Sequence, residues 1–261
     1  LPARPQAAAG ELVLDVREIR KQFGGLTAVN DISFQIRAGQ IVGLIGPNGA
    51  GKSTTFNLVT SVLSKTRGEV HFRGEDISHL RSREILRKGM ARTFQHVKMI
   101  PDMTVLENVA LGAYTRGHTG VVRSMLNLNQ AEERQTFLQA QRQLERIGMG
   151  EYLHEQAGNL AMGPQRLMEI ARALCADPAL LLLDEPAAGL RHKEKQALAD
   201  VLRQLKAEGM SILLVEHDMD LVMQVCDHLV VMEFGTLLTQ GTPEQIQQDP
   251  KVRAAYLGTE H

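Results

Sequence analysis

A glycine-rich segment that ends in a lysine and two hydroxyl residues carries the clearest chemistry in the chain. It reads Gly-Pro-Asn-Gly-Ala-Gly-Lys-Ser-Thr over residues 46–54 and follows the apolar run 41–45. This is the spacing of a phosphate-binding loop that comes after a strand. Its glycines adopt turns closed to residues with a Cβ, so several backbone N–H groups can converge on phosphate oxygens. The segment therefore predicts a site for the phosphates of a nucleotide.

The residue types in this loop have separate roles in that prediction. Lys52 places a positive charge near the β- and γ-phosphates, and Ser53 offers its hydroxyl to Mg²⁺. The helix expected to start near Lys52 adds its positive end. We predict that nine residues bind the nucleotide: Gly46, Pro47, Asn48, Gly49, Ala50, Gly51, Lys52, Ser53 and Thr54.

Two adjacent carboxylates form the second half of the predicted site. Asp184 and Glu185 follow the apolar run 180–183, which is typical of a buried strand. Consecutive side chains at the end of a strand point in different directions, so the two groups can act separately. We predict that Asp184 binds Mg²⁺ and that Glu185 is catalytic, acting on a water molecule in line with the γ-phosphate.

Composition limits what kind of protein this is. The chain has 261 residues and a formal net charge of −1, so we expect one large core and no strongly basic surface for nucleic acid. Cys175 and Cys226 show no metal-binding spacing and are predicted to be reduced core thiols. The apolar runs are too short to cross a bilayer, so we expect any membrane association to come from a partner.

Strand-like and helical patterns divide the chain into four parts. Residues 1–10 are predicted to be a disordered tail. Residues 11–95 are predicted to be a nucleotide-binding core with a small antiparallel sheet, whose strands are expected near 12–16 and 32–36. Helical patterns dominate 96–163, and helices alternate with buried strands over 164–261, which includes the rest of the core and a C-terminal segment. The predicted fold class is α/β.

Five motifs occur in an order that resembles the ATP-binding subunits of ABC transporters, over nearly the whole chain. They are the phosphate loop, Phe94-Gln95, the segment 159–163, Asp184-Glu185-Pro186 and Glu216-His217-Asp218. The resemblance implies the ABC ATPase fold: a P-loop NTPase (RecA-like) core with a small antiparallel β subdomain and an inserted helical subdomain. It also implies ATP and Mg²⁺ as cofactors.

The same resemblance implies roles for single residues. Phe23 would stack on adenine, Gln95 would contact Mg²⁺ or the attacking water, and His217 would contact the γ-phosphate. A signature segment would face the γ-phosphate bound to the opposite protomer: Leu160, Ala161, Met162 and Gly163. Two copies would then form a head-to-tail dimer around two ATP molecules.

A closer resemblance, to the ATP-binding subunits of bacterial high-affinity branched-chain amino-acid importers, rests on six segments: 23–26, 92–96, 103–108, 185–190, 215–219 and 255–258. It implies as partners a second copy or a paralogous subunit, transmembrane permease subunits and, indirectly, a periplasmic binding protein, but no nucleic acid. It also implies a cytoplasmic location, peripheral on the inner face of the bacterial plasma membrane. Uptake of urea, amides or aromatic acids, a soluble ABC ATPase and a regulatory subunit with little hydrolysis remain alternatives.

Three residues depart from the family pattern, and one segment has two interpretations. Ala161 lacks the usual hydroxyl of the signature, Pro164 lacks an N–H, and Arg191 stands where the family usually has Asp or Asn. These departures bear on the contacts between protomers and on the hydrolysis rate. Met99 and Ile100 are either a docking patch for a permease helix or part of the core beneath the helical subdomain.

Overall fold

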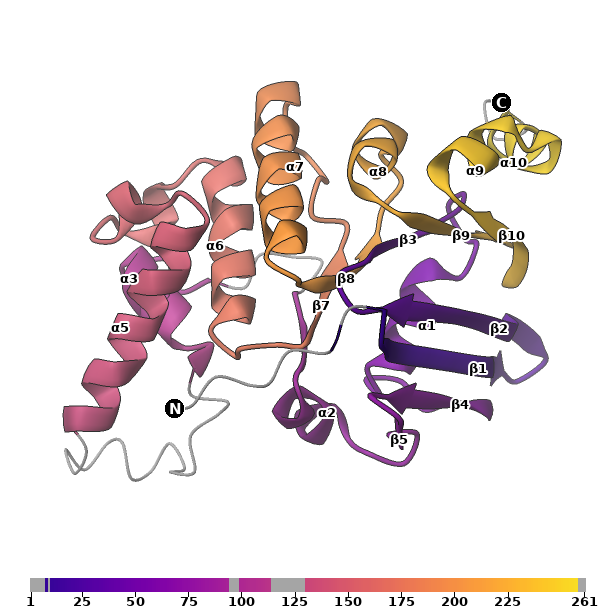
Figure 1. Cartoon of the computed structure of the whole chain (residues 1–261), viewed down its shortest axis with the longest axis horizontal. Coiled ribbons are helices and arrows are strands. Elements are labelled where there is room, and N and C mark those ends of the chain that lie inside the picture. Colours follow the sequence, from indigo (N-terminus) through magenta and orange to yellow (C-terminus); the bar gives the residue numbers. More distant parts are fainter. Residues whose placement is uncertain (1–7, 9, 94–98, 114–129, 258–261) are drawn as a thin grey trace.

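The computed structural model describes residues 8, 10–93, 99–113 and 130–257 (Figure 1). At its centre is a six-stranded sheet in the order β10-β9-β3-β8-β7-β6, whose strands are parallel except for β10. The strands are β3 (Ile41–Ile45), β6 (Met90–Arg92), β7 (Leu180–Asp184), β8 (Ser211–Val215), β9 (His228–Glu233) and β10 (Thr236–Gly241). Every residue of β3, β7 and β8 is buried, which explains why these strands are continuous apolar runs.

A second, antiparallel sheet has the order β2-β1-β4-β5. Its strands are β1 (Leu12–Phe23), β2 (Leu26–Arg37), β4 (Arg67–Phe72) and β5 (Glu75–Asp76). β1 and β2 extend well beyond the ranges 12–16 and 32–36 expected from the sequence. The pairing continues because register shifts along β1 absorb residues that break the alternation of apolar and polar side chains.

Successive residues of the central sheet pack into two different cores. On one face, side chains such as Ile41, Leu181 and Ile212 pack with the helices that follow the inner strands. On the other face, Val42 and Leu182 pack with the antiparallel sheet and the helix after β3. The central sheet is therefore covered on both faces, and the predicted α/β class is confirmed.

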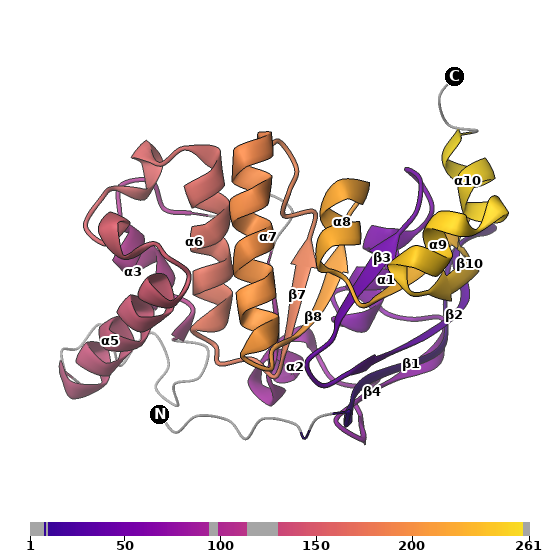
Figure 2. The ribbon, with the colours of Figure 1, turned by 45° about the horizontal axis from the view of Figure 1, so that its top comes forward.

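The helices lie around this sheet, and Figure 2 shows α3, α5 and α6 grouped beside α7. They are α1 (Lys52–Val59), α2 (Ser82–Lys88), α3 (Val105–Ala110), α5 (Gln130–Arg146), α6 (Met162–Leu174), α7 (His192–Ala207), α8 (Met219–Val225), α9 (Pro243–Gln248) and α10 (Pro250–Leu257), with short 3₁₀ turns at Gly150–Tyr152 and Ala157–Asn159. The predicted boundary between residues 163 and 164 falls inside the first turn of α6, and the four-part division stays a prediction.

None of the helices among the described residues is long and apolar enough to cross a membrane.

The C-terminal helix α10 reaches back to the phosphate loop. Burial raises the pKa of the Tyr256 hydroxyl to about 12, and the nearby backbone N–H of Gly46 lowers it. Tyr256 also packs against the larger of the two cores. Residues more than 200 positions apart are thereby in contact at the start of the loop.

Both cysteines are buried and unbridged, as the sequence predicts. Cys175 follows α6 and Cys226 follows α8. Burial raises the pKa of the Cys175 thiol to about 12, and burial also raises that of Cys226. Because the thiolate is the reactive form, both side chains act as small apolar groups of the core.

A substitution at Gly112, which follows α3, tests how tightly α3, α5 and α6 are packed. A Cβ at this position would lie 1.9 Å from the backbone oxygen of Arg172 in α6, so Gly112→Ala forces two backbone segments apart. We expect a loss of about 1–3 kcal/mol in the free energy of unfolding, measured by urea denaturation. Gly150→Ala is the matched control, because its Cβ would meet only a side-chain atom at 3.5 Å. Equal stability of the two variants would contradict this packing.

Candidate functional site

The loop after β3 requires glycine because other backbone segments approach it closely. Gly46 has φ +152°, and a Cβ there would lie 2.2 Å from the backbone oxygen of Met232. Gly51 has φ +96° and precedes α1, and its Cβ would lie 2.7 Å from the backbone oxygen of Ala28. Gly49 has φ +81° at the exposed tip of the loop. The sequence therefore folds into a tight loop whose conformation and close neighbours require glycine at these positions.

Lys52 is the first residue of α1, and its side chain curls back into the loop. Its Nζ donates to the backbone oxygens of Gly46 (2.7 Å) and Pro47 (3.1 Å), and the residue is only 6% exposed. Burial lowers the pKa of the Lys52 ammonium, whereas the charges of Glu185 and Asp184 raise it. Lys52 is thus a buried positive charge close to the two carboxylates, and this position suits the binding of phosphate oxygens.

The other loop residues lie around this lysine. Asn48 is exposed at the tip, and Ala50 is buried with its oxygen accepting a hydrogen bond from the N–H of Gly235 at 3.0 Å. Ser53 and Thr54 are half-buried in the first turn of α1. Their hydroxyls are therefore placed next to the N-terminal end of the helix, where its dipole favours anions.

Parallel pairing brings the predicted carboxylates to the same edge of the sheet. Leu44 of β3 and Asp184 of β7 are both aligned with Val215 of β8. Asp184 is 4% exposed, and its Oδ1 is buried without a hydrogen-bond partner among the described residues. Burial raises the pKa of its carboxyl, while the charge of Arg92 lowers it. A buried carboxylate oxygen of this kind fits a cation, because no donor in the described part of the chain bonds to it.

Glu185 adopts an unusual backbone conformation next to His217. Its φ is +48°, and its N–H donates to the backbone oxygen of Val215 at 2.9 Å. The side chain is 19% exposed, and its Oε1 lies 3.8 Å from Nδ1 of His217. A non-glycine residue with positive φ carries strain that the surrounding structure must hold. The fold thus brings together two residues that the sequence placed in separate motifs.

Arg92 and Glu216 lie in segments that carry the family resemblance, but sequence reasoning gives neither of them a role. Arg92 donates to the side chains of Asn57 and Thr60, each at 3.0 Å, and its charge lowers the pKa of the Asp184 carboxyl. Glu216 is fully buried directly after β8. The signal that could have found them is a charged residue directly next to an apolar strand, which is costly to bury unless it has a structural or chemical role.

The remaining predicted residues lie farther out or outside the described residues. Phe23 ends β1 and is 49% exposed, with the ammonium of Lys21 5.0 Å from its ring centre. The structure makes no statement about Gln95, since residues 94–98 are not described. The adenine and water contacts assigned to Phe23 and Gln95 therefore stay predictions.

The signature segment stands apart from the phosphate loop of the same chain. Leu160 and Ala161 precede α6, and Met162 and Gly163 form its first residues. Figures 1 and 2 both show α6 on the far side of α7 from β3 and α1. Met162 is 49% exposed. The contact of this segment with the nucleotide of a second copy therefore stays a prediction.

Two departures from the family pattern have a local structural explanation. Pro164 lies in the first turn of α6, where an N–H has no partner within the helix, so the proline costs little. Arg191 precedes α7, and its N–H and guanidinium donate to Glu194 at 2.8 and 3.0 Å. Glu194 in turn lies against Gly163, where a Cβ would come within 2.9 Å of it. Arg191 therefore belongs to the same surface as the signature segment.

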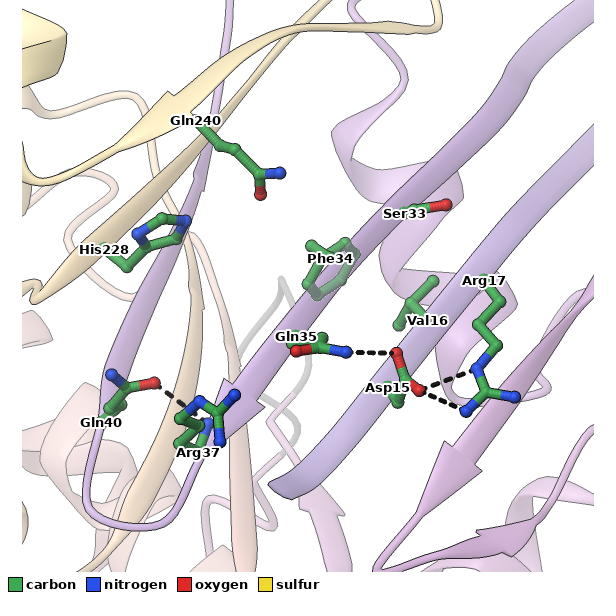
Figure 3. A pocket seen from close by; sticks show the side chains of 10 residues that line it. All are labelled: Asp15, Val16, Arg17, Ser33, Phe34, Gln35, Arg37, Gln40, His228 and Gln240. Carbon is green, nitrogen blue, oxygen red and sulfur yellow. Dashed lines mark hydrogen bonds and ion pairs between the residues drawn. The ribbon is translucent and has the colours of Figure 1, made fainter. Parts of the chain in front are cut away.

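A separate cavity of about 700 Å³ lies between the antiparallel sheet and the edge formed by β9 and β10 (Figure 3). It is lined by Asp15, Val16, Arg17, Ser33, Phe34, Gln35, Arg37, Gln40, His228 and Gln240. Asp15 accepts hydrogen bonds from Arg17 at 2.7 Å and Gln35 at 3.1 Å. This cavity shares no residue with the predicted nucleotide site.

Comparisons with known proteins agree with this geometry. A family model described as "ABC transporter" matches residues 29–188, and one described as "Branched-chain amino acid ATP-binding cassette transporter" matches residues 236–261. The LivG high-affinity branched-chain amino acid transport ATP-binding protein of Salmonella typhimurium is 43% identical over 94% of this chain and 98% of its own. BraF of Pseudomonas aeruginosa, with the same description, is 41% identical over the same shares.

Solved structures support the same assignment. An ATP-binding cassette of an ABC transporter in its ADP conformation superposes with a TM-score of 0.85 and is 32% identical, over 95% of this chain and 99% of that one. A nucleotide-free cassette superposes with a TM-score of 0.82 at 32% identity, over 94% and 98%. The predicted ABC ATPase fold is confirmed. The chain therefore belongs to the ABC transporter family, and it is an ATP-binding and ATP-hydrolysing member of it.

Proposed function

We propose that the chain is the ATP-hydrolysing subunit of an importer for branched-chain amino acids, attached to the cytoplasmic side of a membrane through its permease. The observation that carries the substrate class is the agreement between the C-terminal match over residues 236–261 and the descriptions of LivG and BraF. The descriptions of these relatives name branched-chain amino acids, whereas urea, amides and aromatic acids rest only on the sequence resemblance.

The site residues have separate tasks in this proposal. Lys52 and the loop N–H groups bind the β- and γ-phosphates, and Glu185 accepts a proton from the attacking water. His217 contacts the γ-phosphate. Gln95 contacts the water or the metal and reports to the permease. The signature segment of a second copy, or of a paralogous subunit, completes the site from across a head-to-tail dimer.

Mg²⁺ fits this site as a cofactor shared with the nucleotide. In residues 8, 10–93, 99–113 and 130–257, no three His, Cys, Asp or Glu side chains gather closely enough to hold a metal by themselves. Mg²⁺ does not need such a cage, because it is usually bound through one or two carboxylates together with phosphate oxygens and water. Asp184 and Ser53, with Gln95, would hold it, and the bound ion would neutralise charge on the β- and γ-phosphates.

Reconstituted transport tests the substrate class. The chain would be purified with permease subunits from the same organism, placed in vesicles and supplied with the matching binding protein and internal ATP. We expect ATP-dependent uptake of radiolabelled leucine, isoleucine and valine. Uptake of urea, an amide or an aromatic acid instead of leucine would replace the proposed substrate but keep the transport ATPase. ATP hydrolysis without association with any permease would contradict transport itself.

The two residues before Pro101 differ in their surroundings. Met99 is half-buried and packs against the larger core, whereas Ile100 is 44% exposed. Asn108 fixes the backbone here, since its Oδ1 accepts from the N–H of Ile100 at 2.8 Å and its Nδ2 donates to the oxygen of Ile100 at 3.0 Å. Ile100 thus fits the docking interpretation, and Met99 fits the core interpretation.

Ile100→Ser tests docking to the permease. We expect it to abolish most transport in vesicles while leaving the basal ATPase rate and the melting temperature of the isolated subunit unchanged, because an exposed apolar side chain contributes to docking and little to folding. Met99→Ser is the contrast, and it should lower the melting temperature. Full transport by Ile100→Ser would remove Ile100 from the docking surface.

A further inference from the structure

Glu216 is a buried carboxylate that the proposed hydrolytic steps do not use. It is fully buried and comes directly after β8, between Val215 and His217. Burial raises the pKa of its carboxyl, and hydrogen bonds from three backbone N–H groups lower it. A carboxylate in such a place costs stability unless it is paired and hydrogen-bonded.

Its hydrogen bonds connect two loops at the edge of the central sheet. Oε1 accepts from the N–H of Ala187 at 2.7 Å, in the loop between β7 and α7. Oε2 accepts from the N–H groups of His217 at 3.1 Å and Asp218 at 3.4 Å, in the loop between β8 and α8. The two oxygens of one carboxylate therefore hold both loops together.

The residues that these loops carry are the ones proposed for hydrolysis. Ala187 lies two positions after Glu185, whose positive φ is held partly by its bond to Val215. His217 follows Glu216 directly and comes within 3.8 Å of Glu185. Any change in the bond to Ala187 would move the first loop relative to the second, and so Glu185 relative to His217.

We propose that Glu216 is a positioning residue that sets the placement of Glu185 relative to His217, by accepting hydrogen bonds from one N–H of the β7–α7 loop and two of the β8–α8 loop. The inference rests on the proposed roles of Glu185 and His217 in hydrolysis. Glu216 acts through these backbone groups, and its Oε2 also lies 4.0 Å from Nδ1 of His217.

The ionised form of Glu216 matters because all three backbone groups bonded to it are donors, so both of its oxygens must accept. A carboxylate accepts on both oxygens, whereas a glutamine side chain of the same shape accepts on one side only. Glu216→Gln therefore points an NH₂ group at either the N–H of Ala187 or the N–H groups of His217 and Asp218. One of the two loops then loses its hydrogen bonding to residue 216, while the volume of the side chain stays the same.

Steady-state and binding measurements on Glu216→Gln test the proposal. We expect kcat for ATP hydrolysis to fall by about ten- to a hundredfold, because a small misplacement of catalytic groups has effects of this size. We expect the ATP dissociation constant to change by less than about twofold, because the hydrogen bonds that hold Lys52 in the phosphate loop go to the backbone oxygens of Gly46 and Pro47 and not to Glu216. The rates of the wild type and of Glu216→Gln are compared well below the melting temperature of the less stable of the two, so that only folded protein is measured.

Asp15→Asn is the matched control. Asp15 is also a buried carboxylate that accepts from two neighbours, but it lines the separate cavity of Figure 3. This variant should lose stability without losing kcat. If Glu216→Gln does not fold, Glu216→Asp replaces it, because it keeps the charge and retracts the carboxylate by one methylene group. We expect the same result from Glu216→Asp: kcat falls, and the ATP dissociation constant changes little.

A double-mutant cycle with His217→Ala decides whether Glu216 acts through the geometry of the site. In the His217→Ala background we expect Glu216→Gln to lower kcat much less than in the wild type, because the placement of a missing side chain no longer matters. Equal effects in both backgrounds, or an unchanged kcat in the single variant, would overturn the proposal. A wild-type rate for His217→Ala alone would instead remove His217 from the proposed mechanism, which is a different failure.

Discussion

Lys52→Ala should abolish most ATP binding. Lys52 is the charged side chain that the phosphate loop directs at the β- and γ-phosphates, and a hydrogen bond to a charged group contributes about 1.5–3 kcal/mol. With two phosphates engaged we expect a loss of affinity of about a hundredfold or more, measured by calorimetry at physiological salt. Phe23→Ala should cost less, since stacking on one base is worth about 1–3 kcal/mol.

The structure adds a control to this experiment. Lys52 also bonds to the backbone oxygens of Gly46 and Pro47, so its removal affects the loop itself. The melting temperature without ATP therefore has to be measured beside the affinity. Lys65→Ala provides a comparison, because burial likewise lowers the pKa of Lys65 but its ammonium bonds to the backbone oxygen of Ser78, away from the loop. An unchanged ATP affinity in Lys52→Ala would refute the site.

Glu185→Gln should bind ATP and hydrolyse it very slowly. The amide keeps the shape of the side chain but cannot accept a proton from the attacking water, and loss of a general base typically lowers a rate by about 10²–10⁴-fold. Unhydrolysed ATP should then hold two copies together, so size-exclusion chromatography with MgATP should show a dimer. The backbone strain at this position is unaffected by the change, because both residues have the same branching at Cβ.

Adding Lys52→Ala to Glu185→Gln separates a dimer held by ATP from nonspecific association. The double variant should elute as a monomer with MgATP, since it no longer binds the nucleotide. A Glu185→Gln variant that remains monomeric at all concentrations and turns over ATP at the wild-type rate would contradict both the catalytic role and the dimer.

The parts of the site that the sequence predicts best are those whose neighbours lie close in the chain. The phosphate loop combines a strand, glycines and a helix start within about 15 residues, so local chemistry alone identifies it. The carboxylates after residues 180–183 are placed by parallel pairing, which a buried apolar run already implies. The residues that follow such a run are thus good candidates for a site on sequence grounds alone.

Contacts between distant segments could not be predicted in this way. Glu216 bonds to Ala187, which is 29 positions away, and only the pairing of β7 with β8 brings the two loops together. The length of β1 also escaped prediction, because its register shifts remove the alternation that marks a strand. The link from Arg191 through Glu194 to Gly163 likewise depends on how α6 and α7 pack.

The contact of Tyr256 with the start of the phosphate loop makes this tyrosine an optical reporter. The chain contains three tyrosines and no tryptophan, so its near-ultraviolet emission comes from few groups. One of them, Tyr256, has its hydroxyl buried beside the backbone N–H of Gly46. We therefore expect nucleotide binding to the loop to change the surroundings of that phenol, and with them the tyrosine fluorescence of the chain. A titration with MgATP checks this without a label and without an enzyme assay.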